Sequence, residues 1–224
     1  DLQLTKEFTP FLEPKRYKVV YGGRGSGKSF SIAQLLVLRA FKEPTRILCA
    51  REIQRSISDS VLQLLGDTVT RLGLKDFFDV QKSQIIGKNG SRFLFLGLSN
   101  NISKVKSYEG LDIVWCEESE SISYTSWETL IPTLRKKGSE IWVSFNPNDE
   151  MDDTYQRFVV NPPPDAYVKK VNYNQNPWFP EELEKERLYL KEKNEDLYNH
   201  VWEGEVLSNR DGAYYAKFIP NDQI

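Results

Sequence analysis

The stretch from Tyr21 to Ser29, Tyr-Gly-Gly-Arg-Gly-Ser-Gly-Lys-Ser, constrains this chain more than any other part of its sequence. It matches the pattern Gly-x-x-x-x-Gly-Lys-Ser/Thr, in which backbone N–H groups of a glycine-rich loop surround a phosphate. The glycines let the backbone fold closely, Lys28 brings a positive charge to the β- and γ-phosphates, and the Ser29 hydroxyl can ligate Mg²⁺. The residues predicted to bind a nucleotide are therefore Gly22, Gly23, Arg24, Gly25, Ser26, Gly27, Lys28 and Ser29.

The residues on either side of this stretch give it the context that a phosphate loop requires. Residues 18–21 have the composition of a strand that runs into the loop. The mostly apolar run from Ile32 to Leu38 is typical of a buried helix that leaves it, and the N-terminal end of that helix favours an anion. Strand, loop and helix in this order argue against a chance glycine-rich turn.

Apolar runs and helical periodicities alternate along the rest of the chain. Strands are predicted at 46–51, 77–97 (two strands around a turn at 87–90), 112–118, 140–147 and 166–171. Helices are predicted from an N-cap at Ser56 to a stop at Gly73, and at 125–135, 152–159 and 181–202. This alternation indicates an α/β fold with a mainly parallel central sheet flanked by helices.

Length and composition exclude several classes of protein. The 224 residues suffice for one large domain with a small appendage, and the net charge of −2 argues against a chain that is basic throughout. A local basic patch is still allowed. The sequence has no apolar run long enough to span a bilayer and no signal peptide at its start. We expect Cys49 and Cys116 to be buried thiols in a reducing compartment, and His200 to be structural.

A second predicted strand ends in two carboxylates. Ile113 to Cys116 are apolar or uncharged, and Glu117 and Glu118 follow directly. At the carboxyl end of a parallel strand, both side chains would face the crevice in which such sheets bind ligands. Glu117 could then assist Mg²⁺ binding, and Glu118 could act on the water that attacks the γ-phosphate. The alternative is a solvated acidic turn, since Glu120 follows closely.

The strand at 140–147 ends in Ser144, Phe145 and Asn146. Small polar groups at this place could contact the γ-phosphate and report its loss to the rest of the domain. The alternative is that they only satisfy backbone groups at a turn. The order of the motifs favours P-loop ATPases with an additional strand and a catalytic glutamate. It does not favour GTPases, because Asp-x-x-Gly and Asn-Lys-x-Asp are both missing from the sequence.

Several motifs together resemble one family, the large terminase subunit of tailed double-stranded DNA bacteriophages, over nearly the whole chain and in order. The phosphate loop alone is unspecific, whereas the arginine inside it, the Glu-Glu pair and the Ser-Phe-Asn strand end are more specific together. The matching stretches are Gly-Gly-Arg-Gly-Ser-Gly-Lys-Ser (22–29), Leu-Cys-Ala-Arg-Glu (48–52), Val-Trp-Cys-Glu-Glu-Ser-Glu (114–120), Trp-Val-Ser-Phe-Asn-Pro (142–147), Asp-Asp-Thr-Tyr (152–155) and Asn-Pro-Trp-Phe-Pro (176–180).

The resemblance implies an ATPase that uses ATP and Mg²⁺ to drive viral DNA into a procapsid, in the cytoplasm of a bacterial host. Its implied partners are double-stranded DNA, the portal protein, the small terminase subunit and further copies of the chain in a ring, with no membrane. Residues 1–172 would form the ATPase core and residues 173–210 a lid or linker subdomain. Residues 211–224 would begin a linker to a nuclease domain that is not part of this sequence.

The family's site residues can be carried over position by position. The resemblance implies that Lys28 and Ser29 bind phosphates and Mg²⁺, that Glu117 is the carboxylate on the metal side, and that Glu118 is catalytic. Ser144, Phe145 and Asn146 match the motif that couples hydrolysis to movement. Arg24 matches an arginine that acts in cis as an arginine finger, which stabilises the charge on the transferring phosphate. Two alternatives stay open. Arg24 could pair with a carboxylate such as Glu118, or the arginine finger could come in trans from a neighbouring subunit.

Other functions remain open at this point. A helicase- or recombinase-type translocase normally needs a second motor domain or a self-assembling core, and a small-molecule kinase needs an arginine-rich lid. A protein that binds ATP without turnover would not need Glu118. We expect no nuclease activity, because Asp152 and Asp153 are better explained as a helix start than as metal ligands.

Two further sets of residues are predicted only from their chemistry. Adenine could stack on residues that precede the loop, namely Phe8, Phe11, Arg16 and Tyr17. Phosphates of DNA could contact Lys104, Lys106, Arg135, Lys136, Lys137, Lys169 and Lys170, although surface lysines are more often simply solvated.

Overall fold

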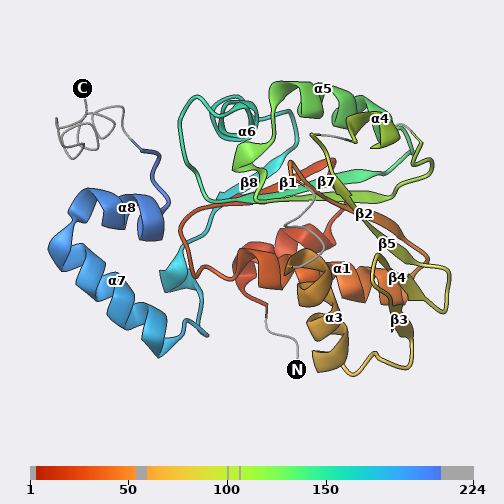
Figure 1. Ribbon diagram of the computed structural model, residues 1–224, viewed down its shortest axis with the longest axis horizontal. Coiled ribbons are helices and arrows are strands. Elements are labelled where there is room, and N and C mark those ends of the chain that lie inside the picture. The colour runs from red at the N-terminus through yellow and green to blue at the C-terminus, as the bar shows by residue number, and fades with distance from the viewer. Residues whose placement is uncertain (1–3, 54–59, 100, 106, 208–224) are drawn as a thin grey trace, which may run out of the picture.

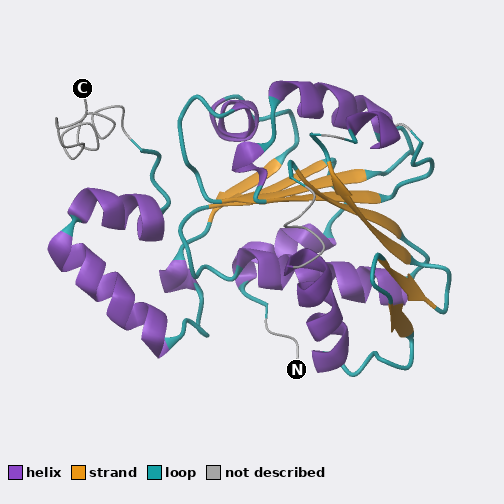
Figure 2. Cartoon of the chain, in the orientation of Figure 1, coloured by secondary structure: helices purple, strands orange, loops and turns teal. Residues whose placement is uncertain are grey.

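In the computed structural model, which describes residues 4–53, 60–99, 101–105 and 107–207, the chain is organised around one eight-stranded sheet (Figures 1 and 2). The strand order is β3-β4-β5-β2-β6-β7-β1-β8. The six strands from β5 to β8 pair in parallel, and β3 and β4 add an antiparallel edge. The strands are β1 (Tyr17–Tyr21), β2 (Arg46–Arg51), β3 (Phe78–Val80), β4 (Gln84–Gly87), β5 (Arg92–Gly97), β6 (Ile113–Glu117), β7 (Glu140–Phe145) and β8 (Tyr167–Lys170).

Helices cover both faces of the sheet, as the alternating pattern predicts. Figure 1 shows α1 and α3 on one face and α4, α5 and α6 on the other, with α7 and α8 at one end. The helical segments are η1 (Lys6–Leu12), α1 (Lys28–Lys42), α3 (Leu62–Arg71), α4 (Ile102–Val105), η3 (Ser119–Ser121), α5 (Tyr124–Thr133), α6 (Asp153–Tyr155), η4 (Gln156–Val160), η5 (Tyr173–Gln175), α7 (Glu181–Lys193) and α8 (Glu195–Glu203). The predicted α/β fold is therefore confirmed.

The central strands are buried on both faces and supply two separate cores. Successive side chains of a strand point to opposite faces, so Ile47 and Cys49 of β2 pack in the core beside α1 while Leu48 and Ala50 pack in the other. All residues of β6 and β7 are buried, as expected for interior parallel strands. Cys49 and Cys116 are both buried free thiols, as predicted. No helix within the described ranges is long and apolar enough to cross a membrane.

The prediction of two strands at 77–97 was wrong, because three strands lie there. The turn at 87–90 does join β4 to β5, with Gly90 at a φ of +91°. The third strand, β3, pairs with β4 through a tight turn in which the Gln81 N–H donates to the Gln84 carbonyl at 2.9 Å. That turn contains no glycine, proline, asparagine or aspartate, and Ser83 is its one residue of a type common in turns, so the sequence signal is weak.

The single predicted helix at 181–202 is two helices. Asn194 separates them: its N–H donates to the Leu190 carbonyl at 2.8 Å, and its side chain accepts from the Leu197 N–H at 3.0 Å. One asparagine thus ends α7 and caps α8. The short helix predicted at 152–159 does begin after Asp152, but it continues as the π-turn η4. The predicted N-cap at Ser56 lies outside the described residues.

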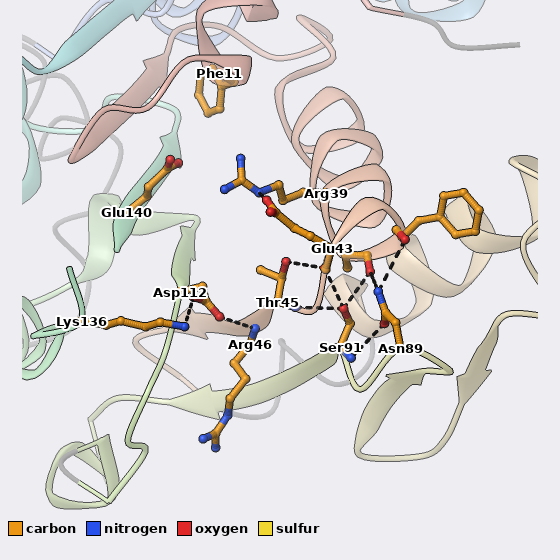
Figure 3. Close-up of polar contacts among 12 residues, drawn as sticks. Phe11, Arg39, Glu43, Thr45, Arg46, Asn89, Ser91, Asp112, Lys136 and Glu140 are labelled. Carbon is orange, nitrogen blue, oxygen red and sulfur yellow. Dashed lines mark hydrogen bonds and ion pairs between the residues drawn. The ribbon is translucent and has the colours of Figure 1, made fainter. Parts of the chain in front are cut away.

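Polar contacts fasten the amino ends of the strands, at the end of the sheet opposite to the phosphate loop. Figure 3 shows the Thr45 N–H donating to Ser91 Oγ at 2.9 Å and the Arg46 N–H donating to Asp112 at 2.8 Å. Asp112 also pairs with Lys136. These contacts hold β5, β2 and β6 together at their amino ends. The carboxyl ends of the strands, at the opposite end of the sheet, are therefore free of these contacts and can form a site.

Candidate functional site

The glycine-rich stretch forms a tight loop between β1 and α1. Gly22, Gly25 and Gly27 have φ angles of +138°, +76° and +76°, which other residues rarely adopt. Gly27 is the N-cap of α1, which begins at Lys28. The Gly22 N–H donates to the Phe145 carbonyl at 3.3 Å, so the loop starts beside the end of β7. The glycines are therefore required by the backbone path of the loop.

Lys28 folds back over the loop. Its ammonium group donates to the carbonyls of Gly22 at 3.0 Å and Gly23 at 2.9 Å, and to Ser26 Oγ at 2.8 Å. The side chain is buried, and burial lowers the pKa of Lys28 to about 7, an effect that Glu120 and Glu117 partly oppose. A phosphate at the loop would offer this lysine anionic oxygens in place of carbonyls.

The two predicted carboxylates lie at the carboxyl end of β6, beside the start of α1. Ser29 Oγ donates to Glu117 Oε1 at 2.8 Å. Glu117 and Glu118 both pair with Arg51 at the end of the neighbouring strand β2, and Arg51 Nη1 lies 2.9 Å from Glu118 Oε2. Burial raises the pKa of Glu117 and the charge of Arg51 opposes the rise. The structure thus joins loop and carboxylates, and excludes a solvated acidic turn at Glu117.

Glu118 has a left-handed backbone, with φ of 47° and ψ of 47°. Along a regular strand, two consecutive side chains would point to opposite faces. The turn at Glu118 ends the strand instead, and Glu117 and Glu118 both reach Arg51 and the same cavity. A non-glycine residue in this region costs on the order of 1 kcal/mol, and such strain is concentrated at functional sites.

A cavity of about 440 Å³ opens between the loop and the ends of β6 and β7. It brings together most of the predicted site residues from three separate parts of the chain. Gly22 and Gly23 are not among them, because these two loop residues pack against Val171 and Trp202. The lining residues are Arg24, Gly25, Ser26, Gly27, Lys28, Ser29, Phe30, Glu117, Glu118, Glu120, Ser144, Phe145 and Asn146.

Two residues of this region were missed by sequence reasoning. Arg51 lies about 66 positions from its partners, and only the adjacency of β2 and β6 reveals it. Glu120 was considered only as part of an acidic turn, yet it lines the cavity, and its Oε2 atom is buried without a hydrogen-bond partner in the described parts of the chain. Burial, together with the charges of Glu118 and Glu117, raises the pKa of Glu120 to about 7. The sequence did contain a signal for Glu120, because a third acidic residue follows the strand so closely.

The end of α8 lies directly against the back of the loop. The Arg24 N–H donates to the Val201 carbonyl at 2.8 Å, and the Gly23 N–H donates to Asn172 Oδ1 at 2.9 Å. A Cβ atom at Gly23 would lie 1.9 Å from the Trp202 carbonyl oxygen, so only glycine allows this approach. The helices after residue 173 therefore touch the loop through its backbone.

Ser144, at the end of β7, belongs to a chain of hydrogen bonds that leads away from the cavity. Trp115 Nε1 donates to Ser144 Oγ at 3.0 Å, and Ser119 Oγ donates to the Ser144 carbonyl at 3.4 Å. The Thr154 hydroxyl donates to the Ser119 carbonyl and accepts from Trp127 Nε1 at 2.9 Å. Ser144 thus does more than satisfy a local turn.

Within the described residues no ion pair joins Arg24 to Glu118, which pairs with Arg51 instead. The Arg24 side chain is exposed at the edge of the cavity. Its role in cis or in trans stays a prediction.

None of the four residues predicted to stack on adenine lines the cavity. Phe8 and Phe11 are buried in the core, where Phe11 packs on Trp142 with ring centroids 4.8 Å apart. Arg16 donates to the Leu134 carbonyl at 2.9 Å, and Tyr17 packs against Phe158. Burial in the core argues against stacking on Phe8 or Phe11, and stacking of adenine on Arg16 or Tyr17 stays a prediction.

The basic residues predicted to contact DNA are scattered. Arg135, Lys136 and Lys137 precede β7 at the end of the sheet opposite to the cavity, Lys169 and Lys170 lie on the edge strand β8, and Lys104 lies on α4. Lys136 is paired with Asp112 (Figure 3). Lys106 lies outside the described residues, and the DNA contacts stay a prediction.

The fold and the site define a class of protein: an additional-strand P-loop nucleotide-binding domain, in which β7 lies between the loop strand β1 and the carboxylate strand β6. The family model described as "Phage terminase large subunit" matches residues 14–205. The chain belongs to this family.

Individual relatives resemble this chain in sequence or, for the solved structures, in fold. The PBSX phage terminase large subunit of Bacillus subtilis (strain 168) is 29% identical and aligns with 99% of this chain, which spans 58% of that relative's length. The large terminase of a thermophilic bacteriophage, also solved in complex with ADP and with ATP-gamma-S, has a TM-score of 0.73 and 12% identity over 90% of this chain and 53% of its own. The large terminase ATPase domain of Thermus phage P74-26 has a TM-score of 0.66 and 15% identity over 89% of this chain and 92% of its own.

Proposed function

We propose that this chain is the motor domain of a terminase large subunit and hydrolyses ATP to translocate double-stranded DNA into a procapsid. The observation that carries the proposal is one connected array, in which Ser29, Glu117, Arg51 and Glu118 are linked within hydrogen-bond distance beside Lys28. The ADP and ATP-gamma-S complexes of the thermophilic phage terminase support ATP as the ligand. The partners of this chain would be DNA, the portal protein, the small terminase subunit and further copies of the chain.

Each side chain would have a distinct part in hydrolysis. Lys28 would exchange its loop carbonyls for the β- and γ-phosphate oxygens. Glu118 would accept a proton from the water whose oxygen attacks the γ-phosphorus, while the bond to the β–γ bridging oxygen breaks and ADP leaves. Arg24, at the rim, could reach the charge that develops on the transferring oxygens.

The residues at the loop fit a magnesium ion. Ser29 and Glu117 present oxygen donors 2.8 Å apart, and Mg²⁺ prefers oxygen ligands. The described residues contain no cluster of three or more His, Cys, Asp or Glu that could hold a metal, which agrees with an ion held largely by phosphate and water. When bound, Mg²⁺ would neutralise charge on the β- and γ-phosphates.

The end of β7 offers a route from the cavity to the rest of the domain. Ser144, Phe145 and Asn146 line the cavity, and Ser144 is hydrogen-bonded through Ser119 to Thr154. Loss of the γ-phosphate would change the surroundings of Asn146 and Ser144. The hydrogen bonds through Ser119 to Thr154 would then transmit this change to α6. This supports the predicted coupling motif.

A small-molecule kinase fits the structure less well. Such an enzyme needs arginines that cover donor and acceptor phosphates. Between residue 173 and residue 207, where the described part of the chain ends, Arg187 is the only arginine. Arg187 is buried, pairs with Glu184 and donates to Tyr198 Oη at 3.1 Å. The Arg187 guanidinium is therefore already bound to residues of α7 and α8, which argues against a role in covering phosphates.

Steady-state phosphate release from Mg-ATP, with and without double-stranded DNA, tests the proposal. We expect release without any small-molecule acceptor, stimulation by DNA, and loss of both in Lys28→Ala. Plasmid incubated with the chain and Mg²⁺ should stay intact. Phosphate release only with an added acceptor would indicate a kinase, and nucleotide binding without release would indicate a nucleotide-gated assembly protein.

A further inference from the structure

The backbone N–H groups of the phosphate loop fall into two sets. Those of Gly22, Gly23 and Arg24 donate to groups outside the loop, at 3.3, 2.9 and 2.8 Å. In the parts of the chain that the structure describes, the N–H groups of residues 25–29 form no such bond, and these residues line the cavity. The second set is therefore the one that can hold an anion.

The turn that follows β8 packs against the loop from outside the cavity. Asn176 Nδ2 donates to the Gly25 carbonyl at 2.7 Å. A Cβ atom at Gly25 would lie 2.2 Å from the ring of Phe179, so this ring covers the loop closely. Earlier in the same turn, Asn172 Oδ1 accepts from the Gly23 N–H at 2.9 Å. Two asparagines of one turn thus bind the first half of the loop.

The side-chain amide of Asn176 is held at both of its ends. Its Oδ1 accepts from the Trp178 N–H at 3.0 Å, so Nδ2 is the group that faces the Gly25 carbonyl. The Asn176 N–H donates to the Tyr173 carbonyl at 3.0 Å, which holds the backbone in the turn. Because the turn fixes Asn176, the Gly25 carbonyl is held in a fixed direction.

That direction determines where one N–H of the second set points. The Gly25 carbonyl and the Ser26 N–H belong to the same planar trans peptide unit, so they point in opposite directions. Asn176 binds the carbonyl and does not line the cavity, whereas Ser26 does. The Ser26 N–H is therefore turned away from Asn176 and toward the side of the loop on which a phosphate would bind.

We propose that Asn176 is a positioning residue of the phosphate loop, which holds the Gly25 carbonyl outward and so directs the Ser26 N–H at the β-phosphate of a nucleotide. The proposal rests on the part of the proposed function in which the loop binds a nucleotide, and not on hydrolysis. The β-phosphate is present in the substrate, the transition state and the ADP product, so this contact contributes to binding at every stage. Asn176 therefore affects KM and the affinity for ADP, and leaves kcat nearly unchanged.

Calorimetric affinities for ADP in the presence of Mg²⁺ test this role. Asn176→Ala removes the donor to the Gly25 carbonyl, so the affinity should fall by about 5- to 10-fold, the size expected for one hydrogen bond. KM for ATP should rise by a similar factor, while kcat changes by less than about twofold. Asn174→Ala is the matched control, because Asn174 is an exposed asparagine of the same turn. Its affinity should equal that of the wild type.

A second pair of variants keeps the shape of the side chain and also serves if Asn176→Ala does not fold. Asn176→Asp preserves the acceptor for the Trp178 N–H but sets an oxygen against the Gly25 carbonyl, so the affinity should fall further than in Asn176→Ala. Asn174→Asp adds the same charge to the turn, and its affinity should stay within about threefold of the wild type.

Three results would overturn the proposal: wild-type affinity in both Asn176 variants, equal losses at Asn174 and Asn176, or a lower kcat at an unchanged KM. The last result would indicate a role in the chemical step instead of in binding. A wild-type chain that binds ADP but does not hydrolyse ATP would overturn the proposed function. The ADP affinities of the variants would still decide the role of Asn176.

Discussion

Replacing Gly23 by alanine should detach α8 from the phosphate loop. The new Cβ would lie 1.9 Å from the Trp202 carbonyl oxygen and 2.4 Å from its carbonyl carbon, and both are backbone atoms that cannot rotate away. Real Cβ contacts are almost never shorter than 3.0 Å, so loop and helix must separate by about 1 Å. The substitution therefore acts on the interface of α8 and the loop.

The size of the effect follows from the contacts that the separation breaks. The hydrogen bonds from the Gly23 N–H to Asn172 at 2.9 Å and from the Arg24 N–H to Val201 at 2.8 Å are each worth about 1 kcal/mol. Asn172 also donates from Nδ2 to the carbonyl of Glu203 in α8 at 3.0 Å, which adds about 1 kcal/mol. Losing roughly 3 kcal/mol of docking energy should raise the opening of α7 and α8 by about 10²-fold.

Hydrogen exchange followed by mass spectrometry measures this opening. Peptides from 181–203 should exchange about 10²-fold faster in Gly23→Ala than in the wild type, while peptides from β6 and β7 should not change. Gly138→Ala is the control, since Gly138 also has a positive φ, of +77°, but a Cβ there meets nothing within 4 Å. Unchanged protection of α7 and α8 in Gly23→Ala would refute the direct contact between loop and helix.

Three further predictions concern charged groups of the loop. Lys28→Ala should abolish nucleotide binding, measured with a fluorescent ATP analogue, without loss of helical circular dichroism. Because burial lowers the pKa of Lys28 to about 7 from the 10.5 of the unfolded chain, the unfolded state binds more protons between these values, and stability should rise with pH there. Between pH 7 and pH 9 the wild type should gain roughly 2 kcal/mol over Lys28→Met in denaturant titrations, and an equal pH dependence would contradict the shift. Arg24→Ala should lower turnover sharply with only a modest loss of affinity, and mixtures with the wild type should be active in proportion to the wild-type fraction. Rescue by a neighbour that carries Lys28→Ala would show that the arginine acts in trans.

The parts of the site that are local in sequence could be predicted, because their geometry follows from a few adjacent residues. The phosphate loop needs glycines at fixed places, and the structure gives Gly22 and Gly27 positive φ angles. The buried strand that ends in Glu117 could be located because a strand covered on both faces is apolar throughout. Its carboxylates then had to lie at the end of the sheet where the loop lies.

Features that depend on the pairing of distant strands could not be predicted. Arg51 reaches Glu117 only because β2 lies next to β6, and nothing near Arg51 in the sequence indicates that order. Gly23 was predicted to bind nucleotide, yet its N–H is taken by Asn172, nearly 150 positions later. Phe11 was considered for adenine because it precedes the loop, but its apolar ring is more stable in the core.

The most direct test of the account is hydrolysis of ATP by Glu118→Gln, measured in a single turnover after its affinity for Mg-ATP has been determined by calorimetry. The substitution keeps the shape of the side chain and removes its ability to accept a proton, while Ser29 and Glu117 keep their contact. We expect affinity within about threefold of the wild type and hydrolysis slower by about 10²-fold or more. Hydrolysis at the wild-type rate, or a loss of binding equal to that of Glu117→Gln, would contradict the assignment of Glu118 as the proton acceptor.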